Sequence, residues 1–174
     1  MCIRDRSDGD LVVVGETSEV NLAFSVPSTS RFGIARFNSD GSPDTDFSDD
    51  GFARVSFNAD AESRPWDVVI QSDGKMVVAG WTNVDSDDDS ELNFAVTRLN
   101  TNGSLDNSFS SNGTMQVDFG VYDSYAHALA IQSDGKIVVA GTYDFSDGDS
   151  KMVVARLNSN GCLLYTSDAA DERS

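Results

Sequence analysis

Short apolar runs recur along the chain, each bounded by polar turn residues. In the middle of the chain, β-branched apolar runs at 66–71 and 75–81 flank a Ser-Asp-Gly turn at 72–74, whose glycine suits a positive φ. Residues 93–100 then alternate in character, and 113–119 supplies a fourth extended run. The period of an amphipathic helix is not found. The pattern predicts four short strands in meander order, the first two forming a tight hairpin.

Three blocks of sequence recur in the same order, about 60 residues apart. The first block, Ser-Asp-Gly-x followed by four apolar residues and glycine, starts at Ser7, Ser72 and Ser133. The second, Arg-(Phe/Leu)-Asn-x-x-Gly, starts at Arg36, Arg98 and Arg156. A third block at 46–51 is echoed at 107–113. The repeats are therefore three, at 7–60, 61–121 and 122–161. The first lacks part of its opening strand, and the third stops after its third strand.

The inner strands of each repeat are apolar on both faces. Val68 and Ile70 point to one side of their strand and Val69 to the other. A sheet that is apolar on both faces must be covered on both, and the next repeat is the available cover. Four-stranded sheets stacked face to face around an axis form a β-propeller. We therefore predict an all-β fold, an incomplete β-propeller of about 2.5–3 blades, each a four-stranded antiparallel meander.

The strings SDGKMVVAGWT, SDGKIVVAGTY and RLNTNGSLDNSF resemble the delta-60 repeat, a β-propeller repeat found mostly in large bacterial proteins. The resemblance covers nearly all of 7–161 and rests on three separate blocks in one order. It implies a propeller scaffold of cell-surface or secreted proteins, usually without an assigned activity. The first repeat departs from it slightly, because Asp10 stands where the others have lysine.

Both ends of the chain differ from the repeats. When the two ends are back-translated, the DNA for residues 1–6 and the DNA for the stretch after 161 are reverse complements where they overlap. This inverted repeat resembles the transposon-end adapter of sequencing libraries. Residues 1–6 and 162–174 are therefore interpreted as adapter-derived and non-native, and 162–174 are expected not to fold with the rest. Cys2 and Cys162 fall in these segments, so 7–161 has no cysteine and no disulfide framework. The absence of a visible signal peptide then carries no information.

The chain is strongly acidic, with 29 Asp and Glu against 12 Lys and Arg and a formal net charge of −17. Such a surface repels phosphate and anionic lipid, so no nucleic acid partner is expected. No apolar run approaches the roughly 20 residues of a membrane helix, so no membrane insertion is expected.

Acidic loops are the one place where metal chemistry is suggested. Calcium takes about six to eight hard oxygen ligands, and clustered carboxylates supply them. The candidate ligands in two loops are Asp85, Asp87, Asp89, Asp144, Asp147 and Asp149. A third acidic group comprises Asp40, Asp44, Asp46, Asp49 and Asp50. Their spacing does not match an EF-hand, and the alternative interpretation is that these loops are solvated turns. Calcium is the only cofactor suggested, and no other is predicted.

Catalytic patterns are not evident. The single histidine, His127, aligns with Trp66 at the start of a strand and is interpreted as a packing residue or a residue at the rim of the blade. It lacks the partners of a nucleophile–base pair or a zinc site. Aromatic residues at strand ends suit either the edge of the core or a sugar-binding rim: Trp66, Trp81, Tyr122, Tyr125 and Tyr143.

Three functions are compatible with these features. The favoured one is a non-catalytic scaffold or interaction module of a larger bacterial protein, extracellular or at the cell surface. It would contact further blades of the same parent chain, and protein or carbohydrate partners. The second is an accessory propeller of an enzyme, for instance a carbohydrate-active one, whose catalytic residues lie elsewhere. The third is a calcium-binding, integrin-like propeller, which the lysine after Ser-Asp-Gly disfavours. With neighbours missing on both sides, the isolated blades are expected to associate or unfold.

Overall fold

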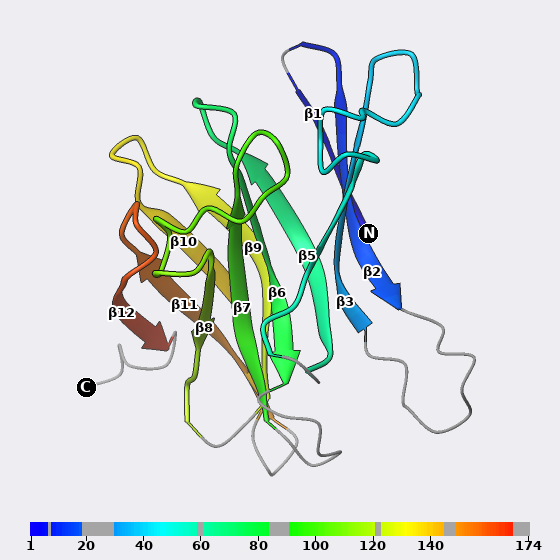
Figure 1. Cartoon of the computed structure of the whole chain (residues 1–174). Coiled ribbons are helices and arrows are strands. Elements are labelled where there is room, and N and C mark those ends of the chain that lie inside the picture. The colour runs from blue at the N-terminus through cyan, green and yellow to red at the C-terminus, as the bar shows by residue number, and fades with distance from the viewer. Residues whose placement is uncertain are drawn as a thin grey trace, which may run out of the picture.

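Three antiparallel four-stranded sheets make up the fold (Figure 1). The computed structural model describes residues 1–6, 8–18, 30–58, 61–83, 91–120, 123–144 and 149–168. Blade 1 contains β1 (Cys2–Asp5), β2 (Leu11–Ser18), β3 (Ser30–Phe37) and β4 (Phe52–Val55). Blade 2 contains β5 (Ser63–Ile70), β6 (Met76–Asn83), β7 (Leu92–Leu99) and β8 (Thr114–Val117). Blade 3 contains β9 (Ser124–Ile131), β10 (Ile137–Asp144), β11 (Ser150–Leu157) and β12 (Leu163–Asp168).

Each sheet is a meander, because its strands pair in chain order from the first to the fourth. The prediction of an all-β, incomplete propeller with four-stranded antiparallel blades is therefore confirmed. Among the described residues, no helix is long and apolar enough to cross a membrane.

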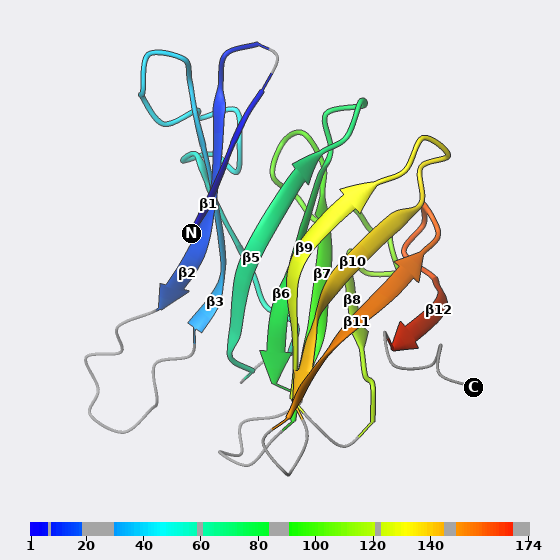
Figure 2. The same ribbon diagram turned by 180° about the vertical axis from the view of Figure 1, so that it is seen from behind.

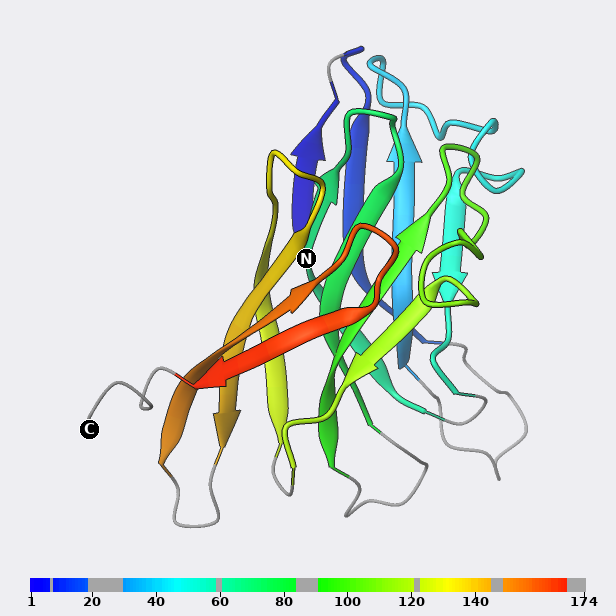
Figure 3. The same ribbon diagram turned by 90° about the vertical axis from the view of Figure 1, so that its left-hand side faces the viewer.

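The blades stack through their first strands. Strand β5 packs against β1, β2 and β3 of blade 1, and β9 packs against β5, β6 and β7 of blade 2. Figure 2 shows β5 and β9 side by side, and Figure 3, seen from the side of blade 3, shows the three sheets one behind another. The stack does not close into a ring, so blade 1 and blade 3 each keep one face that no other described blade covers.

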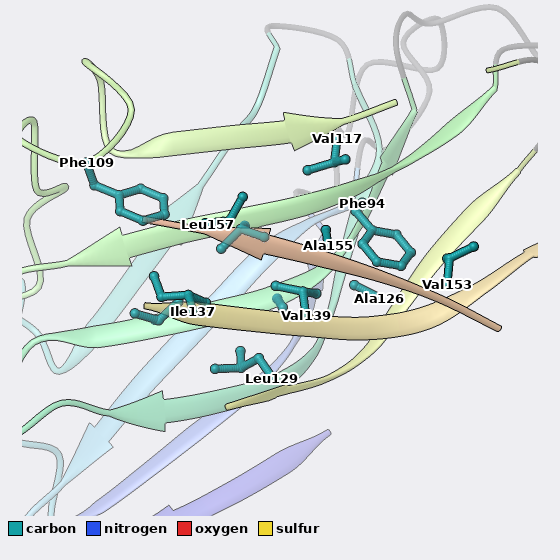
Figure 4. Close-up of a cluster of buried hydrophobic side chains, with 13 residues drawn as sticks. Phe94, Phe109, Val117, Ala126, Leu129, Ile137, Val139, Val153, Ala155 and Leu157 are labelled. Carbon is teal, nitrogen blue, oxygen red and sulfur yellow. The ribbon is translucent and has the colours of Figure 1, made fainter. Parts of the chain in front are cut away.

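Two hydrophobic cores lie between the blades, and both use blade 2. Val68 and Val78 belong to the core shared with blade 1. Val77 and Ala79 belong to the core shared with blade 3, shown in Figure 4. Successive residues of one strand thus enter different cores, because side chains alternate across a strand. For blade 2, this arrangement confirms the prediction that a sheet apolar on both faces is covered on both by its neighbours.

The two ends of the chain form strands. β1 pairs with β2, and β12 pairs with β11. The expectation that the segment from 162 onward does not fold with the rest was therefore wrong for 163–168. The pairing uses backbone groups, which any extended segment offers to a free sheet edge. The side chains of 162–167 remain exposed, so this strand adds little to the core.

Candidate functional site

The candidate calcium ligands fall partly outside the described structure. Asp85, Asp87, Asp89 and Asp147 lie outside the described residues. Asp144 ends β10, and its Oδ1 accepts a hydrogen bond of 2.6 Å from the Ser150 hydroxyl across the hairpin. Asp149 immediately precedes β11. Within the described ranges, no three His, Cys, Asp or Glu side chains gather closely enough to hold a metal ion.

The third acidic group serves turns and a buried ion pair. Asp40 accepts hydrogen bonds from the backbone and hydroxyl of Ser42, and Asp50 accepts one from the backbone of Phe52. These bonds, two residues ahead, are those of Asx turns. Asp44 instead lies against an arginine in the interior.

A β-bulge in the first strand of blades 2 and 3 turns an aromatic side chain out of the regular alternation. The register of β5 against β6 shifts at Trp66, and that of β9 against β10 shifts at His127. Bulges re-aim side chains in this way, often next to binding sites. The two bulge residues meet, with ring centroids 4.5 Å apart. Trp66 and His127, which the sequence places at the same repeat position at the start of a strand, are therefore in direct contact.

A glycine opposite each bulge makes room for it. A Cβ added to Gly80 would lie 2.0 Å from the carbonyl oxygen of Arg64, and one added to Gly141 would lie 1.9 Å from that of Tyr125. No side chain fits such a space. In blade 1, whose first strand is the short β1, Gly15 has nothing within 4 Å of the same position.

Further aromatic and charged side chains surround the bulge residues, and the set Arg64, Trp66, Trp81, Tyr125 and His127 is called the bulge cluster below. The Arg64 guanidinium lies 5.9 Å from the Trp81 ring centroid and pairs with Glu16 of blade 1. Trp81 contacts Tyr125 edge to face. Through the pair between Arg64 and Glu16 in β2, the cluster therefore links all three blades near the start of β5 and β9.

The electrostatics of the bulge cluster favour the uncharged form of its histidine. Burial lowers the pKa of His127, and the negative charge of Asp144 only partly opposes this. His127 Nε2 lies 3.0 Å from the hydroxyl of Thr142, which satisfies it without a charge. Burial raises the pKa of Tyr125, with help from nearby carboxylates including Asp123. Of the other predicted rim aromatics, Tyr143 stacks on Phe119 away from the cluster, and Tyr122 lies outside the described residues.

A second constellation, which we call the Arg–Asp–Phe motif, fastens one blade to the next. In blade 1 its members are Arg36, Asp44 and Phe47. Arg36 Nε donates to Asp44 Oδ2 at 2.6 Å, and its Nη1 donates to the carbonyl oxygen of Thr101 in blade 2 at 2.5 Å. The guanidinium also lies 5.0 Å from the centroid of the Phe47 ring. One arginine thus joins an ion pair, an aromatic ring and the backbone of the next blade.

The same contacts recur between blades 2 and 3. Arg98 Nε donates to Asp106 Oδ2 at 2.7 Å, and Nη1 donates to the carbonyl oxygen of Ser159 at 2.5 Å. Its guanidinium lies 4.9 Å from the centroid of Phe109. Each phenylalanine is fully buried and reaches a glycine of the following blade, Phe109 against Gly161. The motif is therefore a repeated blade-to-blade contact.

The loop after each phenylalanine adds a backbone contact between blades. Ser48 and Ser110 both have a positive φ, of 54° and 47°. In this left-handed conformation the amide of Ser48 donates to the carbonyl of Asn102, and that of Ser110 to the carbonyl of Asn160. Non-glycine residues at positive φ carry strain, here accepted where the chain contacts its neighbour.

The motif carboxylates stay ionised. The hydrogen bond from Arg36 lowers the pKa of Asp44. Burial by itself would raise the pKa of Asp106, but hydrogen bonds from Lys75 and Ser108, with the charge of Arg98, hold it well below its ordinary value. Lys75 occupies the position of Asp10 in blade 1, so the Asp44 ion pair of blade 1 lacks this lysine.

Blade 3 lacks most of the motif. Leu164 stands eight residues after Arg156, where the other blades have aspartate, and Ser167 stands where they have phenylalanine. Among the described residues, the Nε of Arg156 is buried with no hydrogen-bond partner, and its Nη1 lies 3.5 Å from the Tyr165 hydroxyl. Sequence reasoning missed this motif, although the spacing Arg-x7-Asp-x2-Phe is present twice and could have revealed it.

Comparison with known families agrees with this geometry. A family model described as a domain of unknown function (DUF5122) beta-propeller matches residues 6–47, 71–109 and 132–163. These segments cover well over half of the chain. The chain belongs to this family. No curated protein matches the chain.

The DUF5122 segments follow the structural repeat. The first ends at Phe47 and the second at Phe109, so each runs from the β-hairpin turn to the last residue of the Arg–Asp–Phe motif. The third ends at 163, immediately before the position where blade 3 has Leu164. The bulged strands β5 and β9 lie between the matched segments. The family pattern is thus centred on the residues that join blades.

Proposed function

We propose that this chain is a non-catalytic β-propeller scaffold, an interaction module of a larger bacterial protein at the cell surface or outside the cell. One observation carries the proposal: the Arg–Asp–Phe motif is used twice, and each time its buried charges serve the contact with the next blade. The buried charged side chains of this motif are thereby committed to stacking. Further blades of the same kind are the partners that this stacking implies.

Sequencing the parent gene tests the proposal. Genomic DNA is read outward past Ser7 and Gly161. We expect more copies of the repeat, together with a secretion signal and adhesion or sorting modules. If the repeats instead stop beside a domain with a complete catalytic constellation, the scaffold proposal fails and the blades become an accessory part of an enzyme.

The delta-60 resemblance and the interpretation of the ends belong to the same proposal. In the proposed natural protein, the third repeat would continue with an aspartate and a phenylalanine in place of Leu164 and Ser167. The unpartnered Nε of Arg156 and the end of the third family segment at 163 support this. The same genomic sequence tests it, because codons for 162–174 should be absent there.

The bulge cluster favours carbohydrate as a second candidate partner. Trp66 is 40% exposed and its ring contacts that of His127, while the cationic Arg64 lies over the neighbouring Trp81 ring. Exposed aromatic rings next to hydrogen-bonding groups suit sugar rings, which present an apolar face and hydroxyls. Only two tryptophans are present, so the variant Trp81→Phe leaves Trp66 as the sole indole reporter.

Fluorescence of that variant is followed during titration with cellohexaose, chitohexaose and oligogalacturonate. We expect saturable quenching by at least one of them, and its loss in a Trp81→Phe, Arg64→Ala variant that still melts cooperatively. No change with any of the three removes carbohydrate as a candidate partner.

A further inference from the structure

Blade 1 carries an uncovered apolar face. One row of paired residues crosses all four strands of the sheet, from Ile3 through Val13 and Ala35 to Phe52. Ile3 and Phe52 are exposed, and Val13 and Ala35 are half-buried. A shallow groove of about 240 Å³ runs over Val13, Ala35 and Phe52. The row is apolar throughout, unlike the solvent face of an ordinary antiparallel sheet, and Thr17 and Arg54 line one end of the groove.

The residues of this face occupy repeat positions that are buried in the other two blades. Val13 corresponds to Val78 in blade 2 and to Val139 in blade 3, and both of these are fully buried. Val78 packs against blade 1, and Val139 packs against blade 2. The uncovered face of blade 1 is therefore one half of an interface that occurs twice within the chain.

Blade 3 carries the other half. Its uncovered face presents Val138, Ala140, Met152 and Val154. In blade 2 the corresponding residues are Val77, Ala79, Phe94 and Val96, all fully buried against blade 3 in the core that Figure 4 shows. Met152, at the position of Phe94, is 68% exposed. The surface that would cover this face should resemble the opposite face of blade 3, which packs against blade 2.

We propose that a second copy of this chain docks head to tail, with the uncovered face of blade 3 in one copy against the uncovered face of blade 1 in the other. Figure 1 shows these blades at opposite sides of the molecule, so each copy offers both halves. Two copies together have six blades, within the range of about four to eight in closed propellers. A head-to-tail contact whose rotation closes gives a ring, and here the ring is a dimer.

The contacts between copies follow from the internal interfaces. Ser39 occupies the position of Thr101 and Ser159, whose carbonyls accept from the preceding arginine. Arg156 of one copy would therefore donate to the Ser39 carbonyl of the other. Gly41 has nothing within 4 Å of its missing Cβ, whereas the corresponding Gly103 and Gly161 are covered by phenylalanine rings. The turn around Ser39 and Gly41, which would accept contacts from a preceding blade, is thus accessible to one from a second copy.

This inference refines the scaffold proposal only in naming one partner, and it does not depend on where the protein resides. The experiment uses the full chain and two variants that each place a charge on one face, Val13→Asp and Met152→Asp. Sedimentation velocity is run on each variant alone, on an equimolar mixture and on the unmodified chain at up to about 100 μM. Circular dichroism melts show that each variant is folded, and Phe52→Asp replaces Val13→Asp if that variant does not fold.

We expect the unmodified chain to form a species of twice its own mass, and each single variant to remain a monomer. The equimolar mixture should regain a 1:1 dimer, because Val13→Asp keeps its blade 3 face and Met152→Asp keeps its blade 1 face. A monomeric unmodified chain overturns the proposal. So does a mixture that stays monomeric, or a dimer that survives in either variant alone. None of these results bears on the parent gene, so the scaffold proposal is tested separately.

Discussion

The ring of Phe109 covers Gly161 of the following blade so closely that a Cβ added to the glycine would lie 2.8 Å from two ring carbons. Phe109 is fully buried, and its loop also donates a backbone hydrogen bond to Asn160. The contact between blades 2 and 3 therefore depends on the absence of a side chain at Gly161 as much as on the ring of Phe109.

Gly161→Ala should destabilise the chain more than Gly41→Ala does. Both glycines have a φ of +85°, so both variants incur the same backbone strain, of about 1 kcal/mol. Only Gly161 faces a buried ring, and forcing atoms into a packed site costs about 1–3 kcal/mol more. Urea denaturation of the two variants measures the difference directly. Equal losses would show that the phenylalanine ring moves aside freely.

Arg98→Ala should lower the free energy of unfolding by about 3–5 kcal/mol, because it leaves the buried carboxylate of Asp106 without its arginine. In the monomer, Arg156→Ala is the matched control, since Arg156 has no such carboxylate partner among the described residues and should change stability by less than about 1 kcal/mol. Thermal or urea denaturation compares them. A similar loss of unfolding free energy in both variants would show that the effect comes from packing of the aliphatic part of the arginine side chain and not from the ion pair.

Acid should weaken the contacts between blades. The pKa values of Asp44 and Asp106 lie below the ordinary value of 3.8 in the folded chain. Their stabilisation is therefore fully present above that pH and is lost as pH falls toward the folded-state values. We expect the stability gap between the unmodified chain and Asp106→Asn to stay constant from about pH 7 to pH 5 and to narrow below about pH 4. Denaturation across this range measures the gap, and a gap independent of pH contradicts the ion-pair account.

Gly80→Ala should disrupt the bulge of blade 2. A Cβ there would overlap the Arg64 carbonyl, whereas Gly15→Ala, at the corresponding position of blade 1, meets open space. We expect Gly15→Ala to be neutral or slightly stabilising, and Gly80→Ala to cost about 2 kcal/mol or more. Trp66 sits at the bulge, so the emission maximum of the Gly80→Ala variant should also shift. Unchanged emission and stability would show that the bulge does not need its glycine.

Calcium should leave the thermal midpoint unchanged. The Asp144 carboxylate already accepts from Ser150, and the Asp40 and Asp50 carboxylates are engaged in turns. Melts with millimolar Ca²⁺ and with EDTA should agree within about 1 °C, because a ligand that binds only the native state would raise the midpoint. A rise of several degrees that disappears in Asp144→Asn would instead establish a calcium site in the acidic loops.

Local patterns sufficed for the strands and their pairing order. The apolar run that predicts β6 and the Ser-Asp-Gly turn before it fix a hairpin through neighbouring residues alone, and Gly74 has the expected positive φ of 82°. Alternation at Val77 and Val78 correctly indicated two covered faces. The spacing of the Arg–Asp–Phe motif is visible in the sequence, but its contact with the next blade is not, because that contact reaches a carbonyl about 60 residues away and backbone carbonyls carry no signature in sequence.

The sequence by itself determined three repeats of apolar, β-branched segments, hence an all-β chain whose sheets need cover on both sides. Only the tertiary structure decided that Trp66 and His127 touch, that Arg36 and Arg98 reach across to the next blade, and that blades 1 and 3 are left with complementary faces. The reason is physical. Strand formation depends on residues close in the chain, whereas contacts between blades depend on how rigid sheets stack, and that stacking brings together groups that no local pattern relates.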